Sequence, residues 1–146
     1  AIWAGHPARN RDEPTVFADY FDLLLASGRA LTIAEKSGRI IGTSSYYVAP
    51  DGRDALAIGF TFLTRDHWGG GTNFSLKRLM LGHIFAARDQ AWFHIDPTNI
   101  RSQTATERLG AKFVEEAELD LGTGPARWMC YRLHRADWQA LVAARG

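Results

Sequence analysis

The sequence predicts an α/β (α+β) fold with a mixed, mostly antiparallel sheet that contains one central parallel pair of strands. Three observations predict it. Short runs rich in Ile, Thr, Tyr and Val follow one another between residues 30 and 63, with turn residues between them. A glycine-rich loop and an amphipathic helix pattern then lead to another strand pattern, which is the order of a βαβ crossover. The 146 residues, 46% hydrophobic and 23% charged, fit one globular domain over residues 1–146.

The elements before the crossover are a helix and a meander of strands. Residues 1–12 are polar and irregular, and apolar residues at spacings of three and four predict a helix over residues 13–27. The strands are expected at residues 30–35, 39–48 and 55–63, separated by the turns Lys36-Ser37-Gly38 and Pro50-Asp51-Gly52. The third strand is apolar at almost every position, so we expect it to be central and buried.

The crossover spans residues 55–95 and contains a helix over residues 73–89. Its buried face is expected to carry the apolar side chains Leu76, Leu79, Met80, Ile84 and Phe85. Its solvated face is expected to carry Lys77, Arg78 and Arg88. A strand at 91–95, a helix at 99–109 that stops at Gly110, strands at 112–119 and 127–133, and a helix at 136–144 complete the chain.

Charge and cysteine content exclude several classes of protein. Seventeen Lys and Arg against sixteen Asp and Glu give a charge of +1, with no basic run, so we expect no nucleic-acid partner. The longest apolar stretches, such as residues 23–26, are too short to cross a bilayer, so we expect no membrane partner. The single cysteine, Cys130, cannot form an internal disulfide, which favours a reducing compartment and a cytoplasmic location.

Two segments carry candidate binding residues. The glycine loop, Trp68-Gly69-Gly70-Gly71-Thr72-Asn73, opens a helix, so its N–H groups would face a bound anion; the alternative is a flexible turn. Asn99 and Ser102 lie one helical turn apart after the second crossover strand. They would either offer polar groups to a ligand or cap the helix.

Together these segments resemble the GNAT superfamily of acyl-CoA-dependent N-acyltransferases. The resemblance rests on Trp-Gly-Gly-Gly-Thr-Asn opening a helix, followed by Asn-x-x-Ser and Glu-Arg-Leu-Gly-Ala, in the family's order and spacing. It covers residues 13–135 and is greatest for the branch that acetylates ribosomal-protein N-termini. It implies a sheet that splays at its parallel pair to admit coenzyme A, with helices on both faces.

The resemblance also assigns roles to individual residues. The family's pyrophosphate-loop pattern falls on Trp68, Gly71 and Asn73. The N–H groups that would hold the coenzyme A pyrophosphate are those of Gly69, Gly70, Gly71, Thr72 and Asn73. The backbone segment that would pair with the pantetheine arm is Phe62, Leu63 and Thr64, and the Leu63 N–H would stabilise the oxyanion. Asn99 and Ser102 would contact the pantetheine or the sulfur end.

The acid and base of the family are missing at their usual places. Many relatives have a Glu at the position of Ala57 and a second Glu at the position of Ser75. At the position of Thr106 they have the Tyr that acts as the acid. Ser102 is the remaining candidate acid. His94 is the candidate base because its ordinary pKa lies near neutrality; the alternative is a histidine packed under a helix.

The predicted function is transfer of an acetyl group from acetyl-CoA to a primary amine, either a protein N-terminus or a small amine, without a metal. The alternatives are a non-catalytic acyl-CoA-binding module, which Ala57 and Thr106 favour, and a module that binds another nucleotide phosphate. The sequence is compatible with a monomer or a homodimer. Because the chain starts at Ala1, the family's first strand and the start of its first helix are expected to precede it.

Overall fold

The computed structural model describes residues 30–48, 56–68, 71–122 and 124–145. The predicted helix at 13–27, the turn at 50–52 and Gly69 and Gly70 of the glycine loop lie outside the described residues. The chain divides into two compact units, one of residues 1–47 and 58–78 and the other of residues 48–57 and 79–146.

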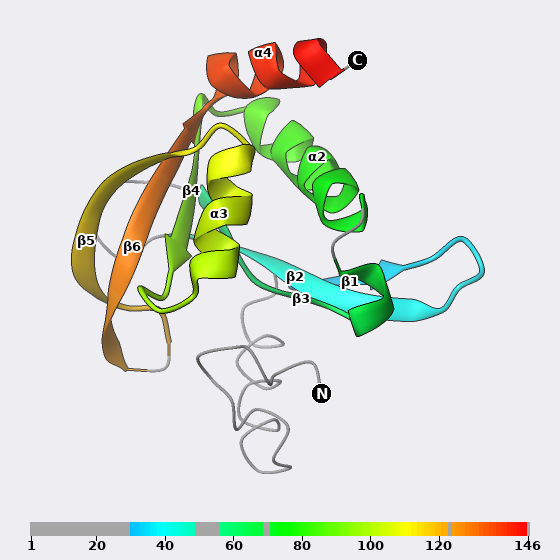
Figure 1. Ribbon diagram of the computed structural model, residues 1–146, viewed down its shortest axis with the longest axis horizontal. Coiled ribbons are helices and arrows are strands. Elements are labelled where there is room, and N and C mark those ends of the chain that lie inside the picture. Colours follow the sequence, from blue (N-terminus) through cyan, green and yellow to red (C-terminus); the bar gives the residue numbers. More distant parts are fainter. Residues whose placement is uncertain (1–29, 49–55, 69–70, 123, 146) are drawn as a thin grey trace. The chain divides into compact units, whose positions relative to one another are not determined.

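The strands follow the predicted order along the chain. They are β1 (Ala30–Ala34), β2 (Ile40–Val48), β3 (Leu56–Leu63), β4 (Gln90–Ile95), β5 (Lys112–Asp120) and β6 (Pro125–His134) (Figure 1). They pair in one six-stranded sheet in the order β1-β2-β3-β4-β6-β5. The pairs β1–β2, β4–β6 and β5–β6 are antiparallel, whereas β3 and β4 are parallel, with Ala57 beside Trp92. The predicted mixed sheet with a central parallel pair is confirmed.

In the first unit, β2 and β3 approach each other closely at Gly42. The Thr64 N–H donates to the Ile41 carbonyl at 2.8 Å, just beyond the end of β3. A Cβ atom added to Gly42 would lie 2.1 Å from the Phe62 carbonyl oxygen, so only glycine fits here. The backbones of β2 and β3 are therefore locked together next to the segment predicted to bind pantetheine.

Strand β3 is kinked and less buried than its apolar sequence predicts. Only Ala57, Ile58 and Leu63 of its eight residues are buried. Phe60 has φ +53°, a left-handed conformation that is strained for a residue with a side chain. Its ring packs edge-on against Tyr47 of β2, with ring centroids 5.6 Å apart. A uniformly buried strand was thus the wrong expectation, because the kink interrupts the regular pleat.

The crossover begins with the short helix η1 (Arg65–His67) and continues in α2 (Thr72–Phe85), where the predicted faces need correction. Leu79, expected to be buried, is 77% exposed, and Lys77, expected in solvent, is 7% exposed. The buried positions of the helix are Lys77, Met80, Leu81, Ile84 and Phe85. These recur at spacings of three and four, so the helical period itself places position 77 on the buried face.

The second unit contains α3 (Ile100–Arg108) and α4 (Arg135–Arg145), each within one residue of its predicted start. Helix α3 is tied to β6 because the buried Tyr131 hydroxyl donates to Glu107 Oε1 at 3.2 Å.

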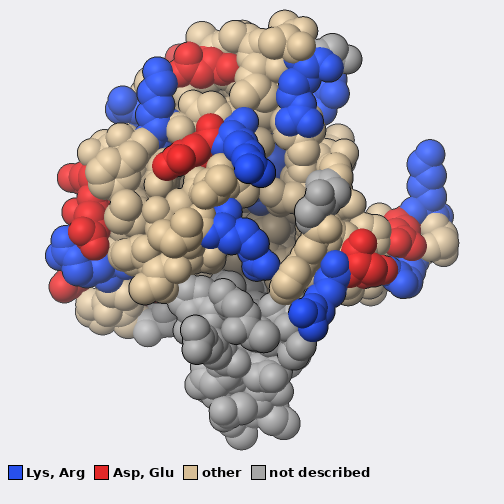
Figure 2. Space-filling view, viewed as in Figure 1, with Lys and Arg blue, Asp and Glu red and all other residues tan. Residues whose placement is uncertain are grey.

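Basic and acidic side chains are interspersed on the face in Figure 2, in keeping with the near-neutral charge. Among the described residues, no helix is long and apolar enough to cross a membrane.

Candidate functional site

The end of β3 presents one of its three predicted backbone positions away from β2. The Thr64 N–H is already bonded to Ile41 of β2, and the Phe62 carbonyl lies against Gly42. Successive residues of an antiparallel ladder alternate between facing and not facing the partner strand. The backbone N–H of Leu63 therefore points away from β2. Of the positions expected to pair with pantetheine, Leu63 directs its N–H away from β2, and the Thr64 N–H is bonded within the sheet.

Trp68, the residue before the glycines of the loop, is hydrogen-bonded to the end of β3. Its indole Nε1–H donates to the Leu63 carbonyl at 2.8 Å, and the Arg65 guanidinium lies 5.5 Å from its ring centroid. Since the indole has a single N–H donor, that donor is not available to an anion. Trp68 is thus bonded to the end of β3, at the position where the resemblance places the family's Gln or Arg.

The loop leads into the N-terminus of α2. Gly71 is exposed, and a Cβ atom added to it would meet nothing within 4 Å. Among the described residues, the Ser75 N–H donates to the Gly71 carbonyl at 2.9 Å, and the N–H groups of Thr72 and Asn73 lie in the first turn of the helix, ahead of this bond. A helix N-terminus of this kind favours an anion, as the sequence predicts.

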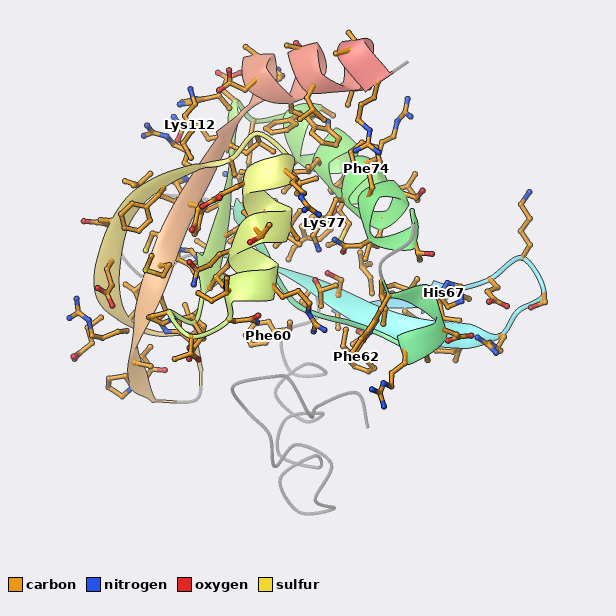
Figure 3. The ribbon with its side chains drawn as sticks, viewed as in Figure 1. Phe60, Phe62, His67, Phe74, Lys77 and Lys112 are labelled. Atoms are coloured by element: carbon orange, nitrogen blue, oxygen red, sulfur yellow. The ribbon has the colours of Figure 1, made fainter. Side chains whose placement is uncertain are left out.

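A histidine fixes this N-terminus to the turn between β1 and β2. His67 Nδ1 lies 3.0 Å from the Thr72 hydroxyl, and His67 Nε2 lies 2.7 Å from Glu35 Oε1 (His67 is labelled in Figure 3). Both ring nitrogens are thus bonded within the protein, one to Glu35 and the other to Thr72 at the start of α2. The sequence offers no signal for the Glu35–His67 pair, because the two residues are 32 positions apart.

Lys77 is the titratable group that the sequence analysis placed wrongly. Its Nζ donates to the Thr61 hydroxyl at 3.1 Å, and that hydroxyl lies 2.7 Å from the Ser44 hydroxyl (Lys77 is labelled in Figure 3). Burial in the unit lowers the pKa of Lys77 to about 8 because it penalises the charged form. Within the described part of the chain, no carboxylate forms an ion pair with it. The spacing of Lys77 from the buried residues Met80 and Leu81 was the signal in the sequence that would have placed it on the buried face.

Asn99 and Ser102 belong to the second unit and meet at the start of α3. The Asn99 side-chain oxygen accepts a hydrogen bond from the Ser102 backbone N–H at 3.2 Å, so the capping interpretation is confirmed. Both residues are half-buried. The cap uses the backbone of Ser102, and its hydroxyl stands on the first turn of the helix.

His94 lies in β4, also in the second unit, opposite Cys130 of β6. It is 7% exposed, and its ring is nearly parallel to that of Trp92. A base has to exchange protons with substrate and solvent, and this degree of burial favours the packed-histidine alternative in the protein without ligand. Among the described residues, no group of three or more His, Cys, Asp or Glu side chains is placed to hold a metal.

The sequence matches the family model of the acetyltransferase (GNAT) domain over residues 2–112. The chain therefore belongs to the GNAT acetyltransferase family. The match covers both the glycine loop and the Asn99–Ser102 segment, on which the resemblance was based.

Solved acetyltransferases have the same fold. A GCN5-related N-acetyltransferase from Brucella melitensis is 14% identical, with a TM-score of 0.74 over 98% of this chain and 73% of its own. Mycobacterium smegmatis RimJ, in complex with CoA-disulfide, is 19% identical, with a TM-score of 0.63 over 94% of this chain and 72% of its own. The aminoglycoside acetyltransferase AAC(6')-Ib, in complex with coenzyme A and kanamycin, is 20% identical, with a TM-score of 0.62 over 90% and 77%. None of the curated proteins compared with the sequence matches it.

Proposed function

We propose that this domain transfers an acetyl group from acetyl-CoA to a primary amine, a protein N-terminus or a small amine, by direct attack on the thioester. The observation that carries the proposal is the end of β3 leading through the glycine loop into the N-terminus of α2, in a chain of the GNAT family. CoA-disulfide in the RimJ complex and coenzyme A in the AAC(6')-Ib complex support the coenzyme, and kanamycin in the second complex supports an amine acceptor.

In this proposal the residues divide the work as follows. The N–H groups of the glycine loop and of Thr72 and Asn73 bind the pyrophosphate. The Leu63 N–H stabilises the oxyanion that forms when the amine attacks the carbonyl carbon. Asn99 and Ser102 contact the pantetheine. As the carbon–sulfur bond breaks, the sulfur takes the electron pair and a proton from the Ser102 hydroxyl, which regains a proton from solvent. The amine's proton passes to His94 or to solvent.

Thiol release from acetyl-CoA over a panel of amines, at several pH values, tests the proposal. Amine-dependent release supports the enzyme. Coenzyme A binding at micromolar concentration without release by any amine would instead support the non-catalytic acyl-CoA-binding module. Thermal stabilisation by ATP or NAD but not by coenzyme A would show that the loop binds another nucleotide.

Gly71→Ala tests the loop without disturbing the protein. The added methyl group meets no protein atom within 4 Å, so the free energy of unfolding should change by less than about 0.5 kcal/mol. A ligand lying against the loop would meet the methyl group, so the Kd for coenzyme A should rise about tenfold, which corresponds to ~1.4 kcal/mol. Calorimetric titration measures the Kd, and an unchanged value would mean that coenzyme A does not approach Gly71.

Ser102→Ala removes the side-chain hydroxyl but keeps the helix cap, so it tests the role of the hydroxyl alone. The substitution keeps the backbone N–H that donates to Asn99, so stability should be unchanged. If the hydroxyl protonates the leaving thiolate, kcat should fall by about 10²-fold. Asn99→Ala is the matched control, since it removes the cap and should cost about 1 kcal/mol of stability. Equal kcat values for Ser102→Ala and the wild type would exclude Ser102 as the acid.

A further inference from the structure

Lys77 is buried, and among the described residues its ammonium donates one hydrogen bond. An ammonium has three N–H donors, and one of them is bonded to the Thr61 hydroxyl. A buried charge that lacks a partner of opposite charge is costly, so such groups are rare outside functional sites. Leu81, one turn further on, is an apolar residue at a buried position of the same helix. Packing therefore does not explain the lysine.

The contact of Lys77 with β3 falls beside the predicted site of chemistry. Thr61 follows the strained residue Phe60 directly and precedes Leu63 by two positions. The Thr61 side chain is held on two sides, by Lys77 of α2 and by Ser44 of β2. A strained residue persists only where its surroundings fix it. The Lys77–Thr61–Ser44 chain therefore fixes the stretch of β3 between the kink and Leu63.

Among the described residues, the groups around Lys77 do not oppose its charge near neutral pH. Thr61 and Ser44, its contacts on β3 and β2, do not titrate. Tyr46 lies on the same face of β2 as Ser44, and burial raises its pKa, so its phenol stays neutral. On α2 itself, Arg78 is exposed. Glu35 and His67 are bonded to each other at the β1–β2 turn.

We propose that Lys77 is an electrostatic positioning residue for acyl transfer: through Thr61 it fixes the β3 segment that carries the thioester, and its ammonium stabilises the negative charge that develops there. This inference rests on the proposed function. When the amine nitrogen bonds to the carbonyl carbon, the π electrons move to oxygen. When the carbon–sulfur bond then breaks, its electron pair moves to sulfur. A fixed positive charge in a low-dielectric site lowers the energy of both anionic stages.

Lys77→Met is the test, because methionine fills a similar volume without charge. The expected result is a kcat about 10²-fold lower at pH 7, with KM for acetyl-CoA changed by less than about threefold, because the effect is on the transition state. The wild type should lose this advantage as pH rises through about 8, where the ammonium gives up its proton. The ratio of the Lys77→Met kcat to the wild-type kcat should therefore rise towards one between pH 8 and pH 10. Taking the ratio at each pH cancels the ionisation of the acceptor amine.

Arg78→Met is the matched control, since it removes one positive charge from the exposed face of the same helix and should give a ratio near one at every pH. Thr61→Val removes the acceptor of Lys77 and should lower kcat in the same direction as Lys77→Met. A folded Lys77→Met protein with wild-type kcat, or with a lower kcat whose ratio does not change with pH, would overturn the inference and leave the proposed function standing. Absence of amine-dependent turnover by the wild type would overturn both.

Discussion

Gly42→Ala is expected to destabilise the domain by about 3 kcal/mol, because the new methyl group has no room. Its Cβ atom would lie 2.1 Å from the Phe62 carbonyl oxygen and 3.1 Å from the Leu63 Cα. Both are backbone atoms of β3, so relief requires that β2 and β3 separate. The Thr64–Ile41 hydrogen bond would lengthen with them. Urea unfolding measures the loss.

Two other glycines serve as controls for Gly42. Gly59→Ala would bring a methyl group to 2.7 Å from the Tyr47 ring, a side chain that can turn, so its loss should be smaller. Gly71→Ala meets no atom and should be neutral. If all three variants were equally stable, the close approach of β2 to β3 would be wrong. A Gly42→Ala protein that folds should also bind coenzyme A more weakly, since Leu63 shifts with its strand.

Lys77→Met is expected to stabilise the domain by about 2 kcal/mol at pH 7. The pKa of Lys77 is about 8 in the folded chain, against 10.5 for an ordinary lysine. This shift is equivalent to about 3 kcal/mol against the folded state at neutral pH, and loss of the bond to Thr61 offsets about 1 kcal/mol when methionine replaces the lysine.

The lowered pKa of Lys77 also determines how the free energy of unfolding of the wild type depends on pH. Between pH 8 and pH 10.5 the unfolded chain still holds a proton on Lys77 that the folded chain has released, so raising the pH favours the folded state. The wild type should gain about 3 kcal/mol over this range relative to Lys77→Met. The difference between the two unfolding free energies at each pH removes the other titrating groups. A constant difference would show that Lys77 titrates like a lysine in water.

Local sequence signals predicted much of the fold, because each of them reports on neighbours in the chain. Gly38 at φ +92° closes the β1–β2 turn, and Gly110 at φ +97° ends α3, where only glycine adopts such angles easily. Asn99 caps α3 for the reason that its side chain suggests. The strand–loop–helix–strand order also predicted the parallel pair, since a crossover of that length requires it.

The features that the sequence did not reveal depend on contacts between distant segments. The left-handed conformation of Phe60 lies where its ring packs against Tyr47, and Gly59, a glycine inside the strand pattern, is the local sign of it that the sequence analysis did not use. Lys77 was assigned to solvent because its type suggested so, although its spacing from Met80 and Leu81 places it inside. Within the candidate site, the sequence identified the backbone segments, whose glycines are visible. It missed the side chains that brace them, such as the indole of Trp68 on the Leu63 carbonyl.

The pairing of Glu35 with His67 connects the β1–β2 hairpin to the start of α2, so changes in the hairpin can affect a segment to which it is not adjacent in the sequence. Glu35 lies immediately after β1, and its partner His67 is bonded to the first residue of α2. Changes of sequence in residues 35–39 would therefore alter the entry to α2 without altering any residue proposed to touch a ligand. For directed evolution, this turn is a short target at which libraries can retune coenzyme affinity while the residues proposed for the chemistry stay fixed.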